Sequence, residues 1–416
     1  MAIECSRRID FLQNQCDRLG ITVVPAGKKL MKDDLVKALR NHFIVEKYGS
    51  LDNVPWDLKF MLSIECPQLC RRIKDLKPAQ QEMVWESQDW IAEEKIDGVR
   101  QLILWNADEK KFHFYSRNNS VEDYLPQDYS DTIYVTSKDF DYSYNFVLDC
   151  EVISTNPELE TNTRCLTQLQ STAALLNLNS VDSKRIQKDN PLKFIVFDCL
   201  FDNESLINSP WTERHKRAIK LENMLRAKGF CCEINPVVEN TDKYPEAKRD
   251  FFDRLIANDR EGIVLKNKNA VYHATSSRTI DCIKVKRSTA DTLAKDLDAF
   301  VTDYVIGKDD TRNSNMVVGF VFSVMLEKQD GSVVTHPIAV CSNVSDFVKE
   351  DATVIDDSGA VKLNPDYYGR VATIQGQNIS ARSLRLTHAV IDCWRPDRSA
   401  DTTDTVLESD LRKLIF

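Results

Sequence analysis

The sequence predicts an α+β protein built from three parts. With 416 residues, the chain is too long for one hydrophobic core. Apolar side chains recur at helical spacing up to residue 88, strand-like segments alternate with amphipathic helices from residue 89, and short strands dominate after residue 298. We therefore expect a helical N-terminal region over residues 1–88, an α+β domain with antiparallel sheets over 89–290, and a C-terminal OB-fold barrel over 291–416.

The N-terminal region is expected to begin with two helices joined by a basic turn that contains Gly27 and Lys28. The apolar residues at helical spacing are Ile9, Leu12, Cys16 and Leu19 in the first helix, and Leu35, Val36, Leu39 and Phe43 in the second. Asp33 and Asp34 are candidate caps of the second helix. The order of helix, extended loop and helix resembles a SAP-type DNA-binding module, and a plain helical hairpin fits equally well. Residues 50–88 are expected to be further helix and linker, without chemistry.

The central part is expected to hold seven strands, at residues 90–94, 99–105, 111–116, 146–154, 194–201, 262–266 and 282–286. One helix should follow Pro210, with Thr212 as its N-cap, and another should run through residues 244–256. Because these elements lack a regular βαβ rhythm, antiparallel sheets are expected.

The last 120 residues are expected to be mainly strands, at residues 300–306, 317–326, 333–340, 370–375 and 385–394. Five strands are what a small closed barrel of the OB type requires.

The composition is that of a soluble globular protein, with 42% hydrophobic and 29% charged residues. The net charge of −9 argues against general coating of nucleic acid or of an anionic membrane, but it leaves room for a local basic groove. Much of the acidity lies in residues 291–416, which hold 13 basic and 20 acidic residues.

The 12 cysteines include no CxxC pair, so they are expected to be reduced and mostly buried rather than metal ligands. The chain shows neither an apolar signal segment at its start nor an apolar run long enough to span a bilayer. We expect an intracellular protein, cytoplasmic or in the nucleoid or nucleus, without a membrane partner. The sequence leaves a cellular or a viral origin open.

One segment carries a specific chemical pattern, because residues 95–100 read Lys-x-Asp-Gly-x-Arg directly after an apolar strand start. The pattern places Lys95 at a strand end, a glycine that permits close backbone approach, and a second cation at Arg100. The alternative is a solvated lysine in a surface hairpin.

Five further segments follow this one in a fixed order: Ser116-Arg117 and residues 146–151, 194–201, 261–266 and 283–286. Each alone would usually mean a buried strand. Together, the six segments resemble the ordered motifs of the covalent nucleotidyltransferases, which comprise ATP-dependent DNA ligases, RNA ligases and mRNA capping enzymes. Cys150 stands where that family more often has glycine.

The resemblance implies an adenylation domain in which the Lys95 amine attacks the α-phosphorus of ATP and expels pyrophosphate. An ordinary lysine is protonated and nucleophilically weak near pH 7. Lys284, Lys286 and a divalent metal would lower its pKa and neutralise the phosphate charge. Glu151 and Glu261 are the expected ligands of Mg²⁺, since that ion prefers hard oxygen donors.

The resemblance also assigns contacts to the bound nucleotide. Glu151 would touch the ribose, Phe197 would stack on adenine, and Glu93 would bind its exocyclic amine. Arg100 and Arg117 would grip the ribose or a nucleic-acid phosphate. The alternative for Phe197 is simple core packing.

The final motif of the family is expected in the C-terminal part, where residues 383–388 and 394–399 resemble the ligase pattern. Three arginines would orient pyrophosphate there: Arg385, Arg395 and Arg398. Ala389 replaces the usual proline, and Arg398 stands for a lysine. An exposed turn with a local ion pair is the alternative.

These features favour an ATP-dependent DNA ligase that seals nicks in three steps. RNA ligase is the main alternative, because the catalytic domain is shared. A capping enzyme, or a nucleic-acid-binding protein that lost its chemistry, fits the motifs less well. The expected cofactors are ATP and Mg²⁺, and the expected partner is nicked duplex DNA, bound by a monomer.

Overall fold

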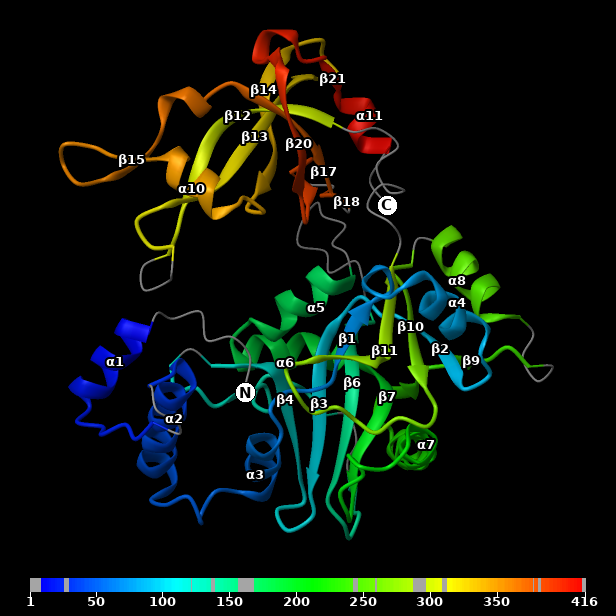
Figure 1. The fold of residues 1–416 in the computed structure, drawn as a ribbon. Helices are drawn as coiled ribbons and strands as arrows, with labels where there is room; N and C mark the ends of the chain where they lie inside the picture. Colours follow the sequence, from blue (N-terminus) through cyan, green and yellow to red (C-terminus); the bar gives the residue numbers. More distant parts are fainter. Residues whose placement is uncertain are drawn as a thin grey trace. The chain divides into compact units, whose positions relative to one another are not determined.

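Two units, each with its own sheets and hydrophobic core, make up the computed structural model (Figure 1). One unit consists mainly of Leu12–Lys286 and the other mainly of Arg287–Phe416. The structure describes residues 9–25, 30–120, 122–135, 139–155, 168–241, 246–258, 260–286, 297–308, 313–376, 378–380 and 383–413.

The larger sheet of the first unit has six strands in the order β5-β4-β3-β6-β7-β8. Its strands are β3 (Val99–Asn106), β4 (Lys111–Asn119), β5 (Pro126–Asp128), β6 (Phe146–Ser154), β7 (Leu192–Asp202) and β8 (Cys232–Ile234). All neighbours pair antiparallel except β7 and β8, which are parallel. The expected central strands are therefore present, and the antiparallel prediction holds for most of this sheet.

The second sheet of this unit has five strands in the order β1-β11-β10-β2-β9. They are β1 (Leu69–Arg72), β2 (Trp90–Glu94), β9 (Val237–Val238), β10 (Gly262–Asn267) and β11 (Arg278–Lys286). The expectation of only helix and linker over residues 50–88 is wrong here, because β1 pairs in parallel with β11. Four residues with two arginines, Leu-Cys-Arg-Arg, carry too weak a strand signal to reveal this pairing.

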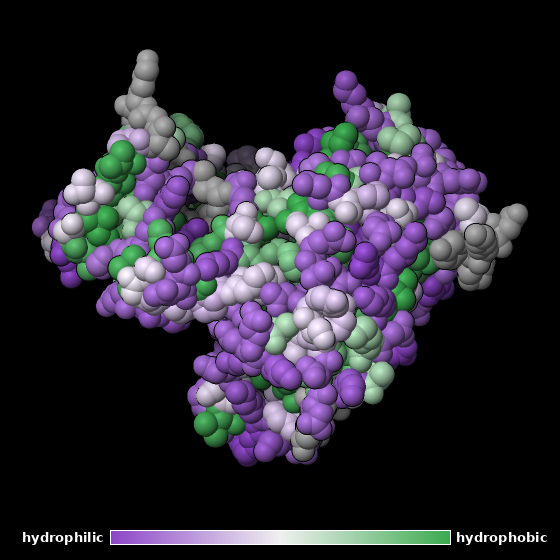
Figure 2. Space-filling model, turned by 90° about the horizontal axis from the view of Figure 1, so that it is seen from below, coloured by the Kyte–Doolittle hydropathy of each residue, from purple (hydrophilic) through white to green (hydrophobic). Residues whose placement is uncertain are grey.

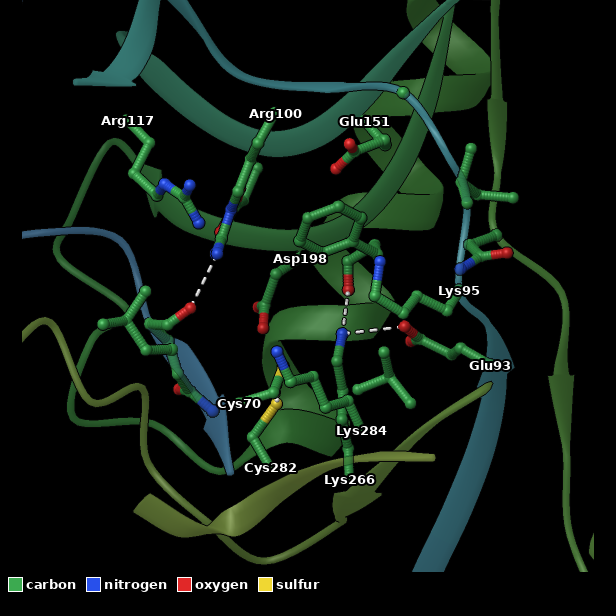
Figure 3. Close-up of a pocket in the computed structure, with 18 of the residues that line it drawn as sticks. Cys70, Glu93, Lys95, Arg100, Arg117, Glu151, Asp198, Lys266, Cys282 and Lys284 are labelled. Atoms are coloured by element: carbon green, nitrogen blue, oxygen red, sulfur yellow. Dashed lines mark hydrogen bonds and ion pairs between the residues drawn. The ribbon is translucent and has the colours of Figure 1, made fainter. Parts of the chain in front are cut away.

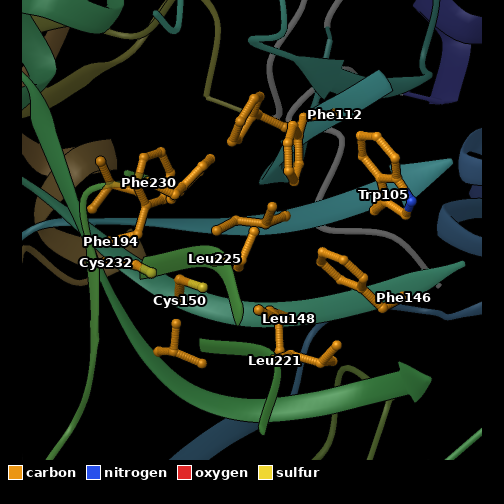
Figure 4. Close-up of a cluster of buried hydrophobic side chains, with 14 of the residues drawn as sticks. Trp105, Phe112, Phe146, Leu148, Cys150, Phe194, Leu221, Leu225, Phe230 and Cys232 are labelled. Atoms are coloured by element: carbon orange, nitrogen blue, oxygen red, sulfur yellow. The ribbon is translucent and has the colours of Figure 1, made fainter. Parts of the chain in front are cut away.

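Helices cover the outer faces of both sheets. Against the six-stranded sheet lie α5 (Gln168–Leu176), α6 (Ser180–Asp189) and α7 (Trp211–Ala227), and against the five-stranded sheet lie α4 (Pro78–Glu86) and α8 (Lys248–Ala257). Figure 4 shows the first of these cores, where Leu221 and Leu225 of α7 meet Leu148 and Cys150 of β6. A further helix, α3 (Trp56–Ser63), covers part of the opposite face of the six-stranded sheet.

The start of α7 differs from the expected one by two residues. The carbonyl of Pro210 accepts hydrogen bonds from the backbone N–H groups of Glu213 and Arg214, so Pro210 is the N-cap and Thr212 lies inside the first turn. Proline is well suited to this place, because it needs no hydrogen-bond donor there.

The expected N-terminal helices are α1 (Ile9–Arg18) and α2 (Lys32–Tyr48). Met31 is the N-cap of α2, and Asp34 in the first turn accepts a hydrogen bond from its backbone N–H at 2.9 Å. Both helices hold the segment after β4, because Tyr124 donates to Gln15 at 2.6 Å and accepts from Arg40 at 2.8 Å through its carbonyl. Gly27 and Lys28 lie outside the described residues, so the SAP-like interpretation stays a prediction.

The second unit is built mainly from strands, with α10 (Asp346–Ala352) and α11 (Glu408–Lys413). Its main sheet contains β12 (Leu297–Ile306), β13 (Val317–Glu327), β14 (Val333–Cys341), β17 (Arg370–Gln375), β20 (Val390–Ser399) and β21 (Val406–Leu407). Two strand pairs stand apart from it, β15 (Thr353–Ile355) with β16 (Val361–Leu363) and β18 (Asn378–Ile379) with β19 (Leu386–Thr387).

This main sheet runs in the order β14-β13-β12-β17-β20, with β21 beside β13, and it does not close into a barrel among the described residues of the unit. The single strand expected over residues 385–394 is divided into β19 and β20. His388 lies between them with a φ of 49°, a left-handed conformation that interrupts an extended strand.

The surface shown in Figure 2 is mainly hydrophilic, with hydrophobic side chains in smaller groups between polar ones. No helix among the described residues is long and apolar enough to cross a membrane.

Candidate active site

A cavity of about 470 Å³ in the first unit is lined by residues from both of its sheets. Strand alternation explains which side chains reach it. In β6, Leu148 and Cys150 point into the helix-covered core, so Asp149 and Glu151 point the other way. In β11, Ile283 faces the core beneath α4 and α8, whereas Lys284 faces the cavity (Figure 3).

Lys95 lies immediately after β2 and lines this cavity. Its backbone N–H donates to the carbonyl of Gly262 at 2.9 Å, and its Nζ donates to one carboxylate oxygen of Glu261. The other oxygen of Glu261 binds Nζ of Lys286. One carboxylate therefore holds two of the predicted lysines, and Lys95 is not the isolated surface lysine of the alternative interpretation.

The two glycines of these motifs permit the close approach of strands around Lys95. A Cβ atom at Gly98 would lie 2.4 Å from the carbonyl oxygen of Val152. A Cβ atom at Gly262 would lie 2.1 Å from that of Val285, and Gly262 also has a φ of +137°. Neither position can take a larger residue without moving the backbone that positions the lysine.

Glu93 is buried at the cavity and forms an ion pair with Lys266 of β10 at 2.8 Å. Burial raises the pKa of Glu93 to about 7, although Lys266 counteracts this. Within the described part of the chain, Oε1 of Glu93 has no hydrogen-bond partner. The cavity therefore holds a hydrogen-bond acceptor that a ligand with an N–H group could satisfy.

Lys266, the last residue of the 261–266 motif, is a further functional candidate to which the sequence assigned no role. It also donates to the carbonyl of Phe197 at 3.1 Å and lies 4.8 Å from the centroid of its ring. Its position in β10, two residues after the cavity-lining Val264, was the available signal, since alternate residues share a face. Phe197 is partly exposed to the cavity, so it is more than a core residue.

Arg100 lines the cavity but is held by the protein itself. It donates to Asp149 at 2.9 Å and to the carbonyl of Gln68 at 2.6 Å, while Tyr272 donates to Asp149 at 2.6 Å. Sequence reasoning missed the roles of Asp149, Gln68 and Tyr272, because a polar network becomes visible only once distant strands are paired. Arg117 of β4 is exposed and also lines the cavity. The predicted phosphate contacts of both arginines stay predictions.

Glu151, the other predicted metal ligand, also faces the cavity. Burial raises its pKa to about 7, against the opposing effect of Lys95 and Arg100. Burial lowers the pKa of Lys284, with further lowering by Lys286. The cavity therefore combines carboxyl groups that resist ionisation with a lysine that loses its proton more easily than usual.

A different cluster of metal-type ligands lies outside the residues that line this cavity. It consists of Asp57, Glu109 and His113, whose ligand atoms are within 4.8 Å of one another. These atoms already have partners, because His113 lies 3.4 Å from Asp57 and 3.2 Å from Glu109, and Tyr115 donates to Asp57 at 2.6 Å. The cluster is explained by its own hydrogen bonds.

Of the three predicted arginines of the second unit, Arg395 and Arg398 share an ion-pair partner in the part of the chain that the structure describes, and Arg385 does not. Arg395 and Arg398 both bind Asp298, at 3.0 and 2.9 Å, and Arg395 also binds Asp397 at 2.7 Å. Arg385 is exposed. The local ion pair of the alternative interpretation is therefore present, and the pyrophosphate role of the three arginines stays a prediction.

The raised pKa of Glu151 predicts how stability depends on pH. A carboxyl group whose pKa is near 7 when folded and near 4.5 when unfolded binds more protons in the folded state, so stability falls as pH rises from about 4.5 to about 7. Glu151 alone is expected to contribute a fall on the order of 3 kcal/mol. Glu93 adds its own fall over the same pH range, so Glu151→Gln should remove only the part that comes from Glu151. Thermal unfolding followed across this pH range measures it. Glu246→Gln, which changes an ion pair with Arg254, is the control, and an equal effect of both variants would contradict the assignment.

Similarity to known proteins agrees with this geometry. DNA ligase 4 of Cryptococcus neoformans is 29% identical over 244 residues, covering 56% of this chain and 22% of that protein. A DNA ligase of Methanopyrus kandleri is 26% identical over 219 residues, covering 52% of this chain and 35% of that protein. This chain thus matches about a fifth to a third of the length of these relatives. A solved structure titled "Pmar-Lig_Pre." has a similar fold, with a TM-score of 0.52 over 88% of this chain and 72% of that one, at 15% identity.

A family of sequences matches the part of the chain that builds the cavity. Residues 67–286 fit the sequence model described as "ATP dependent DNA ligase domain". The match begins just before β1, so it includes Gln68 and β1, which is an edge strand of the five-stranded sheet. Since more than half of its length fits, the chain belongs to the family of proteins with an ATP-dependent DNA ligase domain.

Proposed function

We propose that the protein seals nicks in duplex DNA with ATP through a covalent lysyl-AMP intermediate on Lys95. The observation that carries the proposal is the convergence of Lys95, Glu93, Glu151 and Lys284 on one cavity, with Glu261 holding Lys95. Lys95, Glu151, Glu261 and Lys284 come from four separate sequence motifs, and Glu93 lies two residues before Lys95. Their meeting at one place supports a nucleotide site better than any motif alone.

In the first step, Lys95 passes a proton to the Glu261 carboxylate to which it is hydrogen-bonded, the lone pair of Nζ attacks the α-phosphorus of ATP, and the bond to the pyrophosphate oxygen breaks. Glu261 orients the amine, and Lys284 and Lys286 offset the charge of the phosphates. The unpaired Oε1 of Glu93 accepts a hydrogen bond from the exocyclic amine of adenine, as the family resemblance implies.

Glu151 and Glu261 are proposed to hold a magnesium ion, with the Glu261 carboxylate shared between the ion and the two lysines that it binds. Glu151 and Glu261 supply hard oxygen donors beside the phosphate-binding lysines, and their mutual repulsion is one cause of the raised pKa of Glu151. Mg²⁺ held by these two residues would neutralise phosphate charge when bound.

In the second step, AMP passes to the 5′-phosphate at the nick, and in the third the neighbouring 3′-hydroxyl displaces AMP. The exposure of Arg117 where it lines the cavity supports a contact with a phosphate of the nucleic acid.

Two measurements on the unaltered protein test the proposal. Incubation with ATP or GTP labelled at the α-phosphate, followed by denaturing electrophoresis, should give a covalent label from ATP alone. Nicked DNA should be sealed in preference to a nicked RNA duplex. Sealing of RNA alone would replace the proposal with an RNA ligase, and a protein that binds the nick but takes no label would be a binding protein without the chemistry.

Arg395 gives a prediction that separates the steps. If Arg395 orients pyrophosphate, Arg395→Ala should slow AMP loading by roughly 10- to 100-fold, yet seal a nick that already carries AMP at its 5′-phosphate at the normal rate. Single-turnover rates of both reactions measure this. Arg412→Ala, which removes another arginine of the second unit in an ion pair with Glu408, is the control. Equal slowing of both reactions would argue for a structural role.

We further propose that residues 291–416 form an OB-fold domain and that the protein acts as an intracellular monomer. A separate proposal is that residues 1–88 bind DNA. Deletion of residues 1–50 should weaken binding to a nicked duplex and reduce its dependence on salt, because fewer phosphates would be neutralised. An unchanged affinity and salt slope would remove the N-terminal helices from the DNA-binding surface.

A further inference from the structure

Two cysteines from distant parts of the chain meet in the wall of the nucleotide cavity. Cys70 of β1 and Cys282 of β11 are 212 residues apart in sequence, and their sulfur atoms are 2.9 Å apart. Both residues line the cavity, on the same side of β11 as Lys284 (Figure 3). No other pair of cysteines among the described residues has such a sulfur contact.

An irregularity in the sheet creates this contact. Along β1 the parallel register pairs Cys70 with Thr279, but the next residue, Arg71, pairs with Ile283. The register therefore shifts between Cys70 and Arg71, and the shift brings Cys282 beside Cys70.

The charges around the pair favour one thiolate. The hydrogen bond from Cys282 lowers the pKa of Cys70 to about 6, and Arg100, Lys266 and Lys95 act in the same direction against burial. The same hydrogen bond raises the pKa of Cys282. Loss of a proton is therefore favoured at Cys70 and disfavoured at Cys282, and a thiolate next to a thiol is the reactive arrangement in thiol chemistry.

Other buried cysteines of this unit lack these features. Burial raises the pKa of Cys150 and Cys199 well above the usual value, and that of Cys232 to about 12. They are expected to stay protonated and inert.

We propose that Cys70 and Cys282 are a redox-active dithiol, which a peroxide converts to a disulfide, and that this disulfide stops the loading of AMP on Lys95. The second half of the proposal rests on the proposed function. The Cys70 thiolate attacks one peroxide oxygen and the O–O bond breaks, which gives a sulfenic acid and, after proton uptake, water. The sulfur of Cys282 then attacks the sulfenic sulfur, its proton leaves with the hydroxyl group as a second water, and the S–S bond forms.

Closure would disturb the catalytic residues in two ways. The sulfur atoms must approach by about 0.9 Å to reach a bond length of about 2.05 Å, which pulls on β11 two residues from Lys284. The negative charge that faces Arg100, Lys266 and Lys95 is also lost. Small displacements of catalytic groups of about 1 Å can cost as much as 100-fold in rate.

Peptide mapping of the full chain tests the disulfide itself. The protein is treated with hydrogen peroxide, blocked with N-ethylmaleimide, and digested with trypsin without reduction. We expect residues 60–71 and 279–284 to appear as one linked peptide. Because residues 60–71 also contain Cys66, Cys66→Ser is the matched control and should keep the link, whereas Cys70→Ser and Cys282→Ser should lose it. Absence of the link in the unaltered protein would overturn the proposal.

The consequence for the reaction is measured in the same samples with labelled ATP. Peroxide should reduce AMP loading by at least about tenfold, and dithiothreitol should restore it. In Cys70→Ser and Cys282→Ser the ratio of loading after and before peroxide should stay near one. If the disulfide-linked protein loads AMP as fast as the protein before peroxide treatment, the proposal that the disulfide inhibits loading is overturned. A reduced protein that takes no label would instead refute the proposed function, while the mapping result would stand.

Discussion

Replacing Lys95 with alanine is expected to abolish the transfer of AMP from ATP to the protein. The amine of Lys95 is the proposed nucleophile, and water cannot form a bond that attaches AMP to the chain. Labelled ATP followed by denaturing electrophoresis measures the loss. A label that persists in Lys95→Ala would place the covalent bond elsewhere and contradict the mechanism.

Two further variants separate nucleophilicity from charge. Lys95→Arg keeps a cation beside Glu261, but a guanidinium is not deprotonated in proteins, so this variant should also take no label. Lys268→Ala is the matched control, because Lys268 also binds a glutamate, Glu239 at 2.9 Å, but does not line the cavity. It should load AMP as the unaltered protein does. Labelling of Lys95→Arg would show that only the charge matters.

Replacing Arg214 with methionine is expected to destabilise the first unit by about 3–5 kcal/mol, the usual cost of breaking a buried ion pair. Arg214 is 2% exposed and binds both oxygens of Asp198, at 2.8 and 3.1 Å. It also donates to the carbonyls of Ser209 and Ala270. The variant leaves the buried carboxylate of Asp198 and two partly buried carbonyls without these donors. Urea or thermal unfolding measures the loss.

The same change three residues along α7 is its control. Arg217 binds Asp202 at 3.1 Å, but its side chain is 33% exposed, and Lys220 and Tyr142 also bind Asp202. Arg217→Met should therefore cost at most about 1 kcal/mol. If the two variants were equally destabilising, burial would not be the cause.

Because Asp198 lines the cavity beside Phe197, Arg214→Met is also expected to weaken ATP binding.

The central strands could be predicted from sequence because they carry one of two patterns. Either apolar and polar residues alternate along the strand, or the strand is apolar throughout. In β3, Ile103 and Trp105 pack beneath the helices, whereas Leu102 and Leu104 pack against α3 on the opposite face. A strand buried on both sides reads as a continuous apolar run, which is a strong signal. The order of the motifs then identified Lys95 as the expected nucleophile, and the structure places it in the cavity.

The partners of the predicted residues could not be found in this way. The ion pair of Glu93 with Lys266 depends on the register of β2 and β10, and the network around Arg100 depends on Gln68, which precedes a strand too short to recognise. These contacts are long-range in sequence and leave no local periodicity. The Cys70–Cys282 contact depends in addition on a register shift, which no pattern in either strand announces.

The pairing of β1 with β11 also fixes when the first unit can be completed during synthesis. The two strands are separated by about 200 residues of chain, since Cys70 and Cys282 are 212 positions apart. At the usual 5–20 residues per second, a ribosome needs roughly 10–40 s to make the intervening chain. Until then β1 has no partner strand, whereas every strand of the six-stranded sheet is already synthesised once β8 has been made. The unit is thus expected to acquire its cavity, and with it the capacity to bind a nucleotide, only as one of the last events after β11 has emerged.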